Sequence, residues 1–277
     1  MYHEKINLKS AFPNLNKQVE LIAYCPDNFS EYSTGKKRKT IILLPGGGYS
    51  FLSEREDEVV ALRLIGYDLN VFVLHYNLGP YHFPYPLLEG LAAVAYIRKN
   101  ASKYHVDEDA ICVMGFSAGG HFAATIAAYH HDQKFTSILN LNPEDTKVNG
   151  AILAYPVITM GQNTHNGTME NVTNNQAELI DFYSIEKHVT KQFPKTFIWT
   201  THDDTIVDSV NSLLLANALK ASEVKFELHY YPLGDHGTSL ADKSCYNQEN
   251  LDLHYMEEIK YFSNWIDLAI KFIKEII

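Results

Sequence analysis

Short apolar runs rich in β-branched and aromatic residues recur along the chain, and amphipathic stretches separate most of them. The runs are continuously apolar, which is typical of strands buried on both faces of a parallel sheet. Strands alternating with helices predict the α/β class, with a mostly parallel central sheet covered by helices on both faces. The 277 residues are enough for one such domain, residues 1–277. The predicted strands begin at Val19, Thr40, Asn70, Ala110, Ala151, Thr196 and Lys225.

Several stretches between these runs follow the helical period. The first has Ser53 and Glu56 at the spacing of a capping box, with further acids in the first turn, where the helix dipole favours them. We therefore interpret these carboxylates as helix-end residues and not as a catalytic pair. The last stretch, from Tyr255 to Ile277, predicts one long closing helix.

One long interruption, about residues 159–195, is polar and rich in asparagine. We interpret it as a small cap-like insertion over the carboxyl edge of the sheet, where ligands bind in open α/β folds.

Residues 115–119 read G-x-S-x-G, with a predicted strand before them and a predicted helix after them. A strand that turns directly into a helix strains the turn residue and exposes its side chain, while small neighbours let the flanking chain pass close. Glycines and a serine also make ordinary loops, so the pentapeptide alone does not decide. In its strand-to-helix context it predicts Ser117 as a nucleophile.

A serine hydroxyl needs a base, and the base needs a carboxylate to hold its tautomer. Among thirteen histidines, His236 stands in a glycine-bracketed loop just after the last predicted strand, where an imidazole can reach a neighbouring strand end. Asp203 and Asp204 directly follow the strand that begins at Thr196. Since adjacent side chains diverge, at most one of them faces His236.

An oxyanion hole needs backbone N–H groups, one of them from the residue after the nucleophile, here Ala118. The loop after the strand at Thr40 supplies Gly46, Gly47 and Gly48 for the second donor. Three glycines can also be a flexible turn. They lack the G-K-[ST] ending of a phosphate-binding loop.

Charge and cysteine usage exclude several classes. A formal net charge of −10 argues against nucleic acid or an anionic membrane as the main partner. Three widely spaced cysteines without a Cys/His cluster predict reduced thiols in a cytoplasmic protein, and no metal. The first ten residues show no secretory signal, and no run approaches the roughly 20 apolar residues of a membrane helix.

Four segments together resemble the acetyl esterase and acetylxylan-esterase-like (carbohydrate esterase) branch of the α/β hydrolases: "PGGGY", "GFSAGGH", "THDDTIVDSVNSLLLANAL" and "HYYPLGDHGTSL". The resemblance runs from about residue 20 to the end of the chain. It implies the α/β-hydrolase fold and a serine carboxylesterase acting on short acyl esters, often acetyl groups on sugars, without cofactor or metal. It also favours Asp204 over Asp203 as the acid, implies Gly46 and Gly47 as donors beside Ala118, and makes a homo-oligomer an expectation.

Aromatic residues near the predicted site are candidates for the acyl or sugar pocket, although each is equally compatible with the core: Tyr49, Phe51, Tyr76 and Tyr155. A formamidase or an aminoacyl peptidase can use the same triad, and a hydrolase-fold binding protein with an inactive site is a further alternative. A lipase usually has a broad apolar lid, so the polar insertion favours a small or sugar-like ester. A glycosidase needs two carboxylates facing one cleft, and no such pair is evident.

Overall fold

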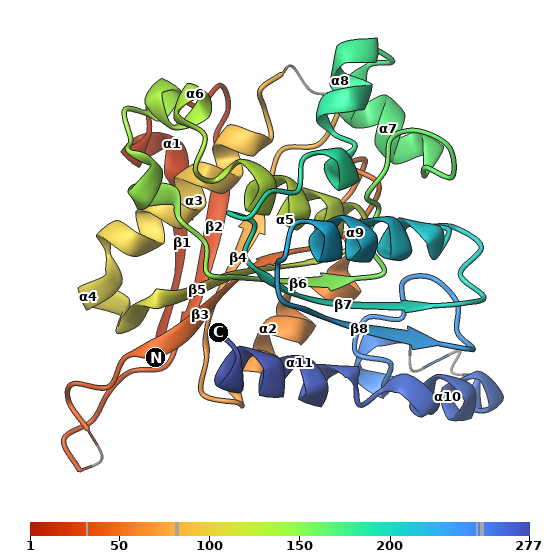
Figure 1. Cartoon of the computed structure of the whole chain (residues 1–277). Coiled ribbons are helices and arrows are strands. Elements are labelled where there is room, and N and C mark those ends of the chain that lie inside the picture. Colours follow the sequence, from red (N-terminus) through yellow and green to blue (C-terminus); the bar gives the residue numbers. More distant parts are fainter. Residues whose placement is uncertain (32, 81–82, 248, 250–251) are drawn as a thin grey trace.

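Eight strands form one sheet at the centre of the molecule, in the order β1-β2-β4-β3-β5-β6-β7-β8 (Figure 1). The structure is a computed structural model that describes residues 1–31, 33–80, 83–247, 249 and 252–277. The strands are β1 (Tyr2–Asn7), β2 (Glu20–Cys25), β3 (Arg38–Leu44), β4 (Asn70–His75), β5 (Val106–Phe116), β6 (Gly150–Ala154), β7 (Lys195–Thr201) and β8 (Phe226–Tyr231).

Six neighbouring strands are parallel, in the order β4-β3-β5-β6-β7-β8. At one edge, β2 pairs antiparallel with β4, and β1 pairs antiparallel with β2. The parallel strands at the centre are almost entirely buried, as their continuous apolar sequences require. The predicted mostly parallel sheet and the α/β-hydrolase fold are thus confirmed.

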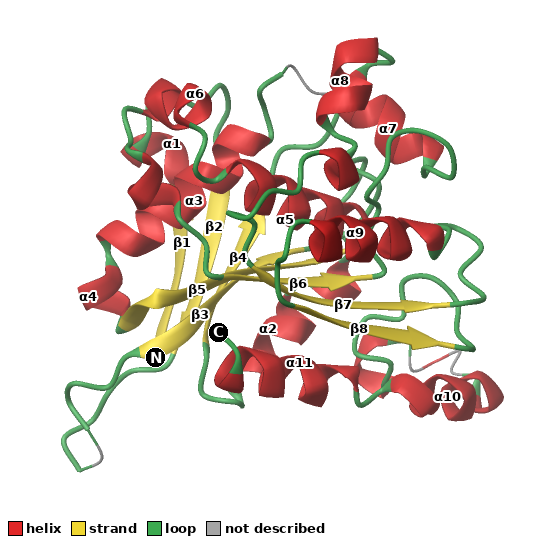
Figure 2. Ribbon diagram, in the orientation of Figure 1, coloured by secondary structure: helices red, strands yellow, loops and turns green. Residues whose placement is uncertain are grey.

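Helices cover both faces of the sheet, as Figure 2 shows. Helices α3 (Leu87–Lys99), α5 (Ala118–Tyr129) and α9 (Val210–Ala221) pack on one face and share one apolar cluster with it. Helices α2 (Glu58–Ile65) and α11 (Trp265–Glu275) pack on the other face in a second cluster. The short helices are α1 (Leu8–Ala11), α4 (Ala101–Tyr104), α6 (Gln133–Thr136), α7 (Asn166–Thr173), α8 (Ala177–Phe182) and α10 (Leu253–Ile259).

The structure departs from the sequence predictions at three places. Strand β1 has no counterpart among the predicted strands, because it is an edge strand whose residues are mostly polar and only partly buried. The prediction of one long closing helix is wrong. A 3-10 turn over Lys260–Phe262 separates α10 from α11, and Ser263 Oγ donates to the Lys260 carbonyl at this turn. The prediction of a capping box is also wrong, since the Ser53 side chain makes no capping hydrogen bond.

The polar segment 159–195 contains α7, α8 and a 3-10 turn, and both helices lie above α5 and α9 in the view of Figure 1. Two side chains tie it to the sheet framework. Asn211 of α9 donates to the carbonyl of Asn163 and accepts from the Ile158 amide. Asn171 of α7 donates to the Gly48 carbonyl, 2.9 Å away. The segment is therefore anchored against the glycine loop that follows β3.

In the part of the chain that the structure describes, every helix is too short or too polar to cross a bilayer.

Candidate active site

Ser117 stands at the turn between β5 and α5, with φ of 53° and ψ of −120°. This left-handed backbone is strained for a residue with a side chain, and close packing of the flanking chain holds it in place. A Cβ on Gly119 would lie 2.1 Å from the Leu44 carbonyl oxygen, and one on Gly115 would lie 2.0 Å from the Gly119 carbonyl oxygen. The two glycines of the motif are therefore needed for the chain to pass so close to itself.

A chain of hydrogen bonds joins Ser117, His236 and Asp204. Ser117 Oγ lies 2.8 Å from His236 Nε2, and His236 Nδ1 lies 2.6 Å from Asp204 Oδ2. A carboxylate at Nδ1 selects the tautomer with its proton on that nitrogen, which leaves Nε2 free to accept the serine proton. The three groups come from the turns and loops after β5, β7 and β8.

The carboxylate at His236 belongs to Asp204, which the resemblance favoured, while Asp203 is exposed. The Asp204 side chain is fully buried, and its Oδ1 accepts from the backbone amides of Ile206 and Val207 at 3.0 and 2.9 Å. These two amides fix the carboxylate in a turn, so that its other oxygen faces the imidazole.

The glycine loop differs from the expectation at Gly46. Its N–H donates to the Glu56 carboxylate, with 2.8 Å between the Gly46 nitrogen and Oε2, so this amide is already paired. The amides of Gly47 and Ala118 donate to no acceptor among the described residues. Ala118 is the first residue of α5, where an amide has no partner within the helix. Of the three donors that the family resemblance implies, Gly47 and Ala118 thus remain available.

Glu56 is a site residue that the sequence reasoning missed. It is buried, and it also accepts from the Tyr155 hydroxyl, 2.8 Å from Oε1. Tyr155 in turn accepts from the Ser239 amide, and its ring packs edge-on against His236 at 5.0 Å between centroids. Burial raises the pKa of the Glu56 carboxyl, and the two hydrogen bonds oppose that rise. In the sequence Glu56 is one acid among several in a helix start, which gave no signal.

A cavity of about 310 Å³ opens at Ser117 and His236. Phe51 is 59% exposed and contributes to its wall, whereas Tyr49, Tyr76 and Tyr155 are at most 2% exposed and belong to the core behind it. The pocket prediction for these three tyrosines is therefore wrong, because their rings pack inside the two apolar clusters of the core. The other lining residues are Gly47, Gly48, Ser50, Ser53, Arg55, Glu56, His165, Ile206 and Gly237.

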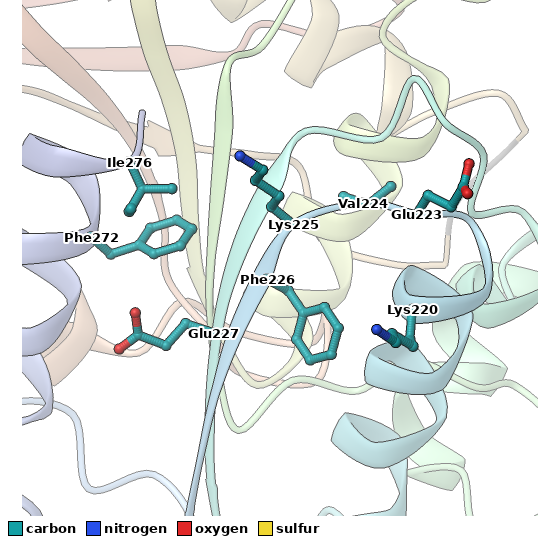
Figure 3. A pocket seen from close by; sticks show the side chains of 8 residues that line it. All are labelled: Lys220, Glu223, Val224, Lys225, Phe226, Glu227, Phe272 and Ile276. Carbon is teal, nitrogen blue, oxygen red and sulfur yellow. The ribbon is translucent and has the colours of Figure 1, made fainter.

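A second hollow, of about 600 Å³, lies away from this site between the end of α9, β8 and α11 (Figure 3). Its walls contain Lys220, Glu223, Lys225 and Glu227 beside Phe226 and Phe272, and they include no nucleophile and base in contact. Among the described residues, no group of three or more His, Cys, Asp or Glu side chains could hold a metal ion.

Known proteins resemble the chain over most of its length. Endo-1,4-beta-xylanase B of Butyrivibrio fibrisolvens is 36% identical over 222 residues, 76% of this chain and 34% of that protein. Acetylxylan esterase of Xylanibacter ruminicola is 26% identical over 228 residues, 79% of this chain and 44% of that protein. The chain thus spans between about a third and a half of these curated relatives.

Among solved structures, the acetyl ester-xyloside bifunctional hydrolase from Caldicellulosiruptor lactoaceticus superposes with a TM-score of 0.77. It is 31% identical, and the match covers 96% of both chains. The family model BD-FAE matches residues 27–219. The chain therefore belongs to the BD-FAE family of α/β hydrolases.

Proposed function

We propose that the chain is a serine carboxylesterase that hydrolyses short-chain acyl esters, acetyl esters above all, through a Ser-His-Asp acyl-enzyme mechanism. The observation that supports this most strongly is the chain of hydrogen bonds from Ser117 through His236 to Asp204 beside an open cavity. Nucleophile, base and orienting carboxylate are in hydrogen-bond contact with one another, as this mechanism requires.

The reaction proceeds in two steps. His236 Nε2 takes the proton of Ser117 as Oγ bonds to the ester carbonyl carbon, and the bond to the alcohol oxygen then breaks. The departing alcohol receives the proton from His236, which leaves an acyl-serine. Water then adds to the acyl carbon, gives a proton to His236, and displaces Ser117, which takes that proton back as the acid is released. Asp204 stabilises the imidazolium in both steps.

The oxyanion of each tetrahedral intermediate is held by the amides of Gly47 and Ala118, which donate to no acceptor in the described part of the chain. Gly46 directly precedes Gly47, and its own amide donates to Glu56. This hydrogen bond holds the loop in position. Removal of a single donor typically lowers turnover about 100- to 1000-fold, so turnover depends on the position of this loop as well as on the triad.

The substrate class follows from the walls of the cavity. Phe51 and Ile206 are exposed apolar side chains at its rim, while serines, Arg55 and His165 supply polar groups. A sugar offers apolar C–H faces and several hydroxyl groups, which this mixture suits. Two similar proteins carry names that mention acetyl ester or acetylxylan substrates. We therefore propose acetylated sugars as substrates. Cytoplasmic location and homo-oligomeric assembly remain predictions.

The test is hydrolysis of 4-nitrophenyl acetate, butyrate and octanoate by the wild-type protein and by Ser117→Ala. We expect turnover that favours acetate and disappears in the variant. The amidase alternative is tested on the same preparations with aminoacyl 4-nitroanilides. Activity that survives in Ser117→Ala would overturn the mechanism. Activity on amides alone would establish the amidase, and no turnover of any substrate would favour the inactive binding protein.

A further inference from the structure

His165 brings a side chain from the polar segment 159–195 into the same cavity as Ser117 and His236. It is the residue just before α7, and its ring lies beside the glycine loop: a Cβ on Gly48 would be 3.5 Å from His165 Cε1. The ring therefore forms part of the cavity wall next to the proposed oxyanion donors.

The contacts of His165 determine its tautomer. The backbone N–H of Thr168 donates to Nδ1 at 3.2 Å, and the Thr168 hydroxyl lies 2.9 Å from the same nitrogen. A backbone amide can only donate, so Nδ1 carries a lone pair. In a neutral imidazole the proton then resides on Nε2. Burial lowers the pKa of the His165 ring and nearby His236 lowers it further, which keeps the ring neutral at pH 7.

The Nε2–H group is a donor without an acceptor among the described residues. It is also rigidly held, because Nδ1 caps α7 and Asn171 of the same helix is bonded to the Gly48 carbonyl. Because this side chain is already held in place, it loses little conformational entropy when Nε2–H forms a hydrogen bond with an acceptor on the substrate.

We propose that His165 Nε2–H donates a hydrogen bond to an oxygen of the alcohol part of the ester, and so selects alcohols that carry a second oxygen near the acylated one. The inference rests on the proposed function. A short hydrocarbon acyl group offers no acceptor besides its carbonyl, which the oxyanion donors take. The alcohol part is then the one that can meet His165.

The test uses His165→Asn, since asparagine is a good helix cap but cannot reach as far as Nε2. The substrates are mono-O-acetylated methyl xylosides, their monodeoxy analogues, and 4-nitrophenyl acetate. We expect the variant to lower kcat/KM about tenfold on at least one acetylated xyloside, mainly through KM. The loss on 4-nitrophenyl acetate should be several-fold smaller than the loss on the xyloside, because its alcohol part carries no hydroxyl group beside the acylated oxygen. On the deoxy analogue that lacks the recognised hydroxyl, wild type and variant should be equal.

His254→Asn makes the same chemical change on an exposed histidine and serves as the control. Equal losses on the xyloside and on 4-nitrophenyl acetate would assign His165 a structural role and overturn the inference, as would unchanged activity on every xyloside. A wild-type protein that hydrolyses 4-nitrophenyl acetate through Ser117 but no acetylated xyloside would overturn the inference alone. If the wild type hydrolyses no ester, the proposed function fails and the inference with it.

Discussion

Glu56 Oε2 accepts a 2.8 Å hydrogen bond from the backbone N–H of Gly46 and thereby anchors the glycine loop from below. Its other oxygen accepts from Tyr155, whose ring packs against His236. One buried carboxylate thus connects the loop of the proposed oxyanion hole with the side chain that supports the proposed base. The two hydrogen bonds hold the buried carboxyl group in one position, and this fixes the place of the Gly46 amide.

We expect Glu56→Ala to lower kcat about 100-fold with little change in KM, because a displaced loop weakens the oxyanion donors that act in the transition state. Glu56→Gln can still accept from Gly46 and should lose less. Steady-state kinetics on 4-nitrophenyl acetate measure both. Glu54→Gln, an exposed acid in the same turn, is the control. A folded Glu56→Ala protein with wild-type kcat would refute the anchoring role.

Asp204→Asn should lower kcat by about 10⁴-fold, because the amide can donate to Nδ1 and so favour the tautomer of His236 that cannot accept the serine proton. Asp203→Asn changes the same group on the adjacent exposed residue and should leave kcat within about twofold. The measurement is kcat for both variants on one ester. Comparable losses in the two variants would contradict the assignment of Asp204 as the triad acid.

We expect the buried His121 to make the protein less stable in acid. It is buried, with Nε2 2.9 Å from the Tyr183 carbonyl and Nδ1 2.8 Å from the Tyr49 hydroxyl, and burial lowers its pKa from 6.5 to about 4. Between these pH values the unfolded chain binds a proton at this residue and the folded chain does not. The free energy of unfolding therefore falls as the pH drops from 6.5 to about 4, by about 3 kcal/mol from this residue.

Urea unfolding of wild type and His121→Gln at pH 7.5 and at pH 4.5 measures this contribution. The variant should lose less stability between the two pH values, because it lacks the titrating group. Its dependence will not vanish, since burial lowers the pKa of His130 to about 4 as well. An identical pH dependence in wild type and variant would show that His121 does not contribute.

Gly119→Ala should both destabilise the protein and remove ester hydrolysis. Its Cβ would lie 2.1 Å from the Leu44 carbonyl oxygen and 2.5 Å from that of Pro45, so α5 or the end of β3 must move. Rigid backbone atoms cannot yield as a flexible side chain can, and we expect a loss of about 2 kcal/mol or more. Thermal unfolding and 4-nitrophenyl acetate hydrolysis measure the two effects. Gly35→Ala, where a Cβ meets nothing within 4 Å, should match wild type in both.

The sequence by itself determined most of the framework. Short continuous apolar runs that alternate with amphipathic stretches are typical of strands buried on two faces, so the parallel sheet and its helical layers follow from local pattern. The edge strand β1 was not predicted, because a half-exposed strand of mostly polar residues has a weak hydrophobic pattern. The contact of Ser117 and His236 with Asp204 could be predicted because turn chemistry and chain order are local properties that a family resemblance can sharpen.

Only the tertiary structure decided which backbone amides stay unpaired and which side chains face the cavity. Gly46 and Gly47 are alike in sequence, yet Glu56, ten residues beyond Gly46, takes the amide of Gly46. Tyr49 and Phe51 stand two residues apart, yet one is buried and the other lines the cavity. His165 reaches the site from a polar segment with no motif. The hydrogen-bond partners and the burial of a residue depend on which distant segments of the chain pack against it. The local sequence pattern does not contain that information.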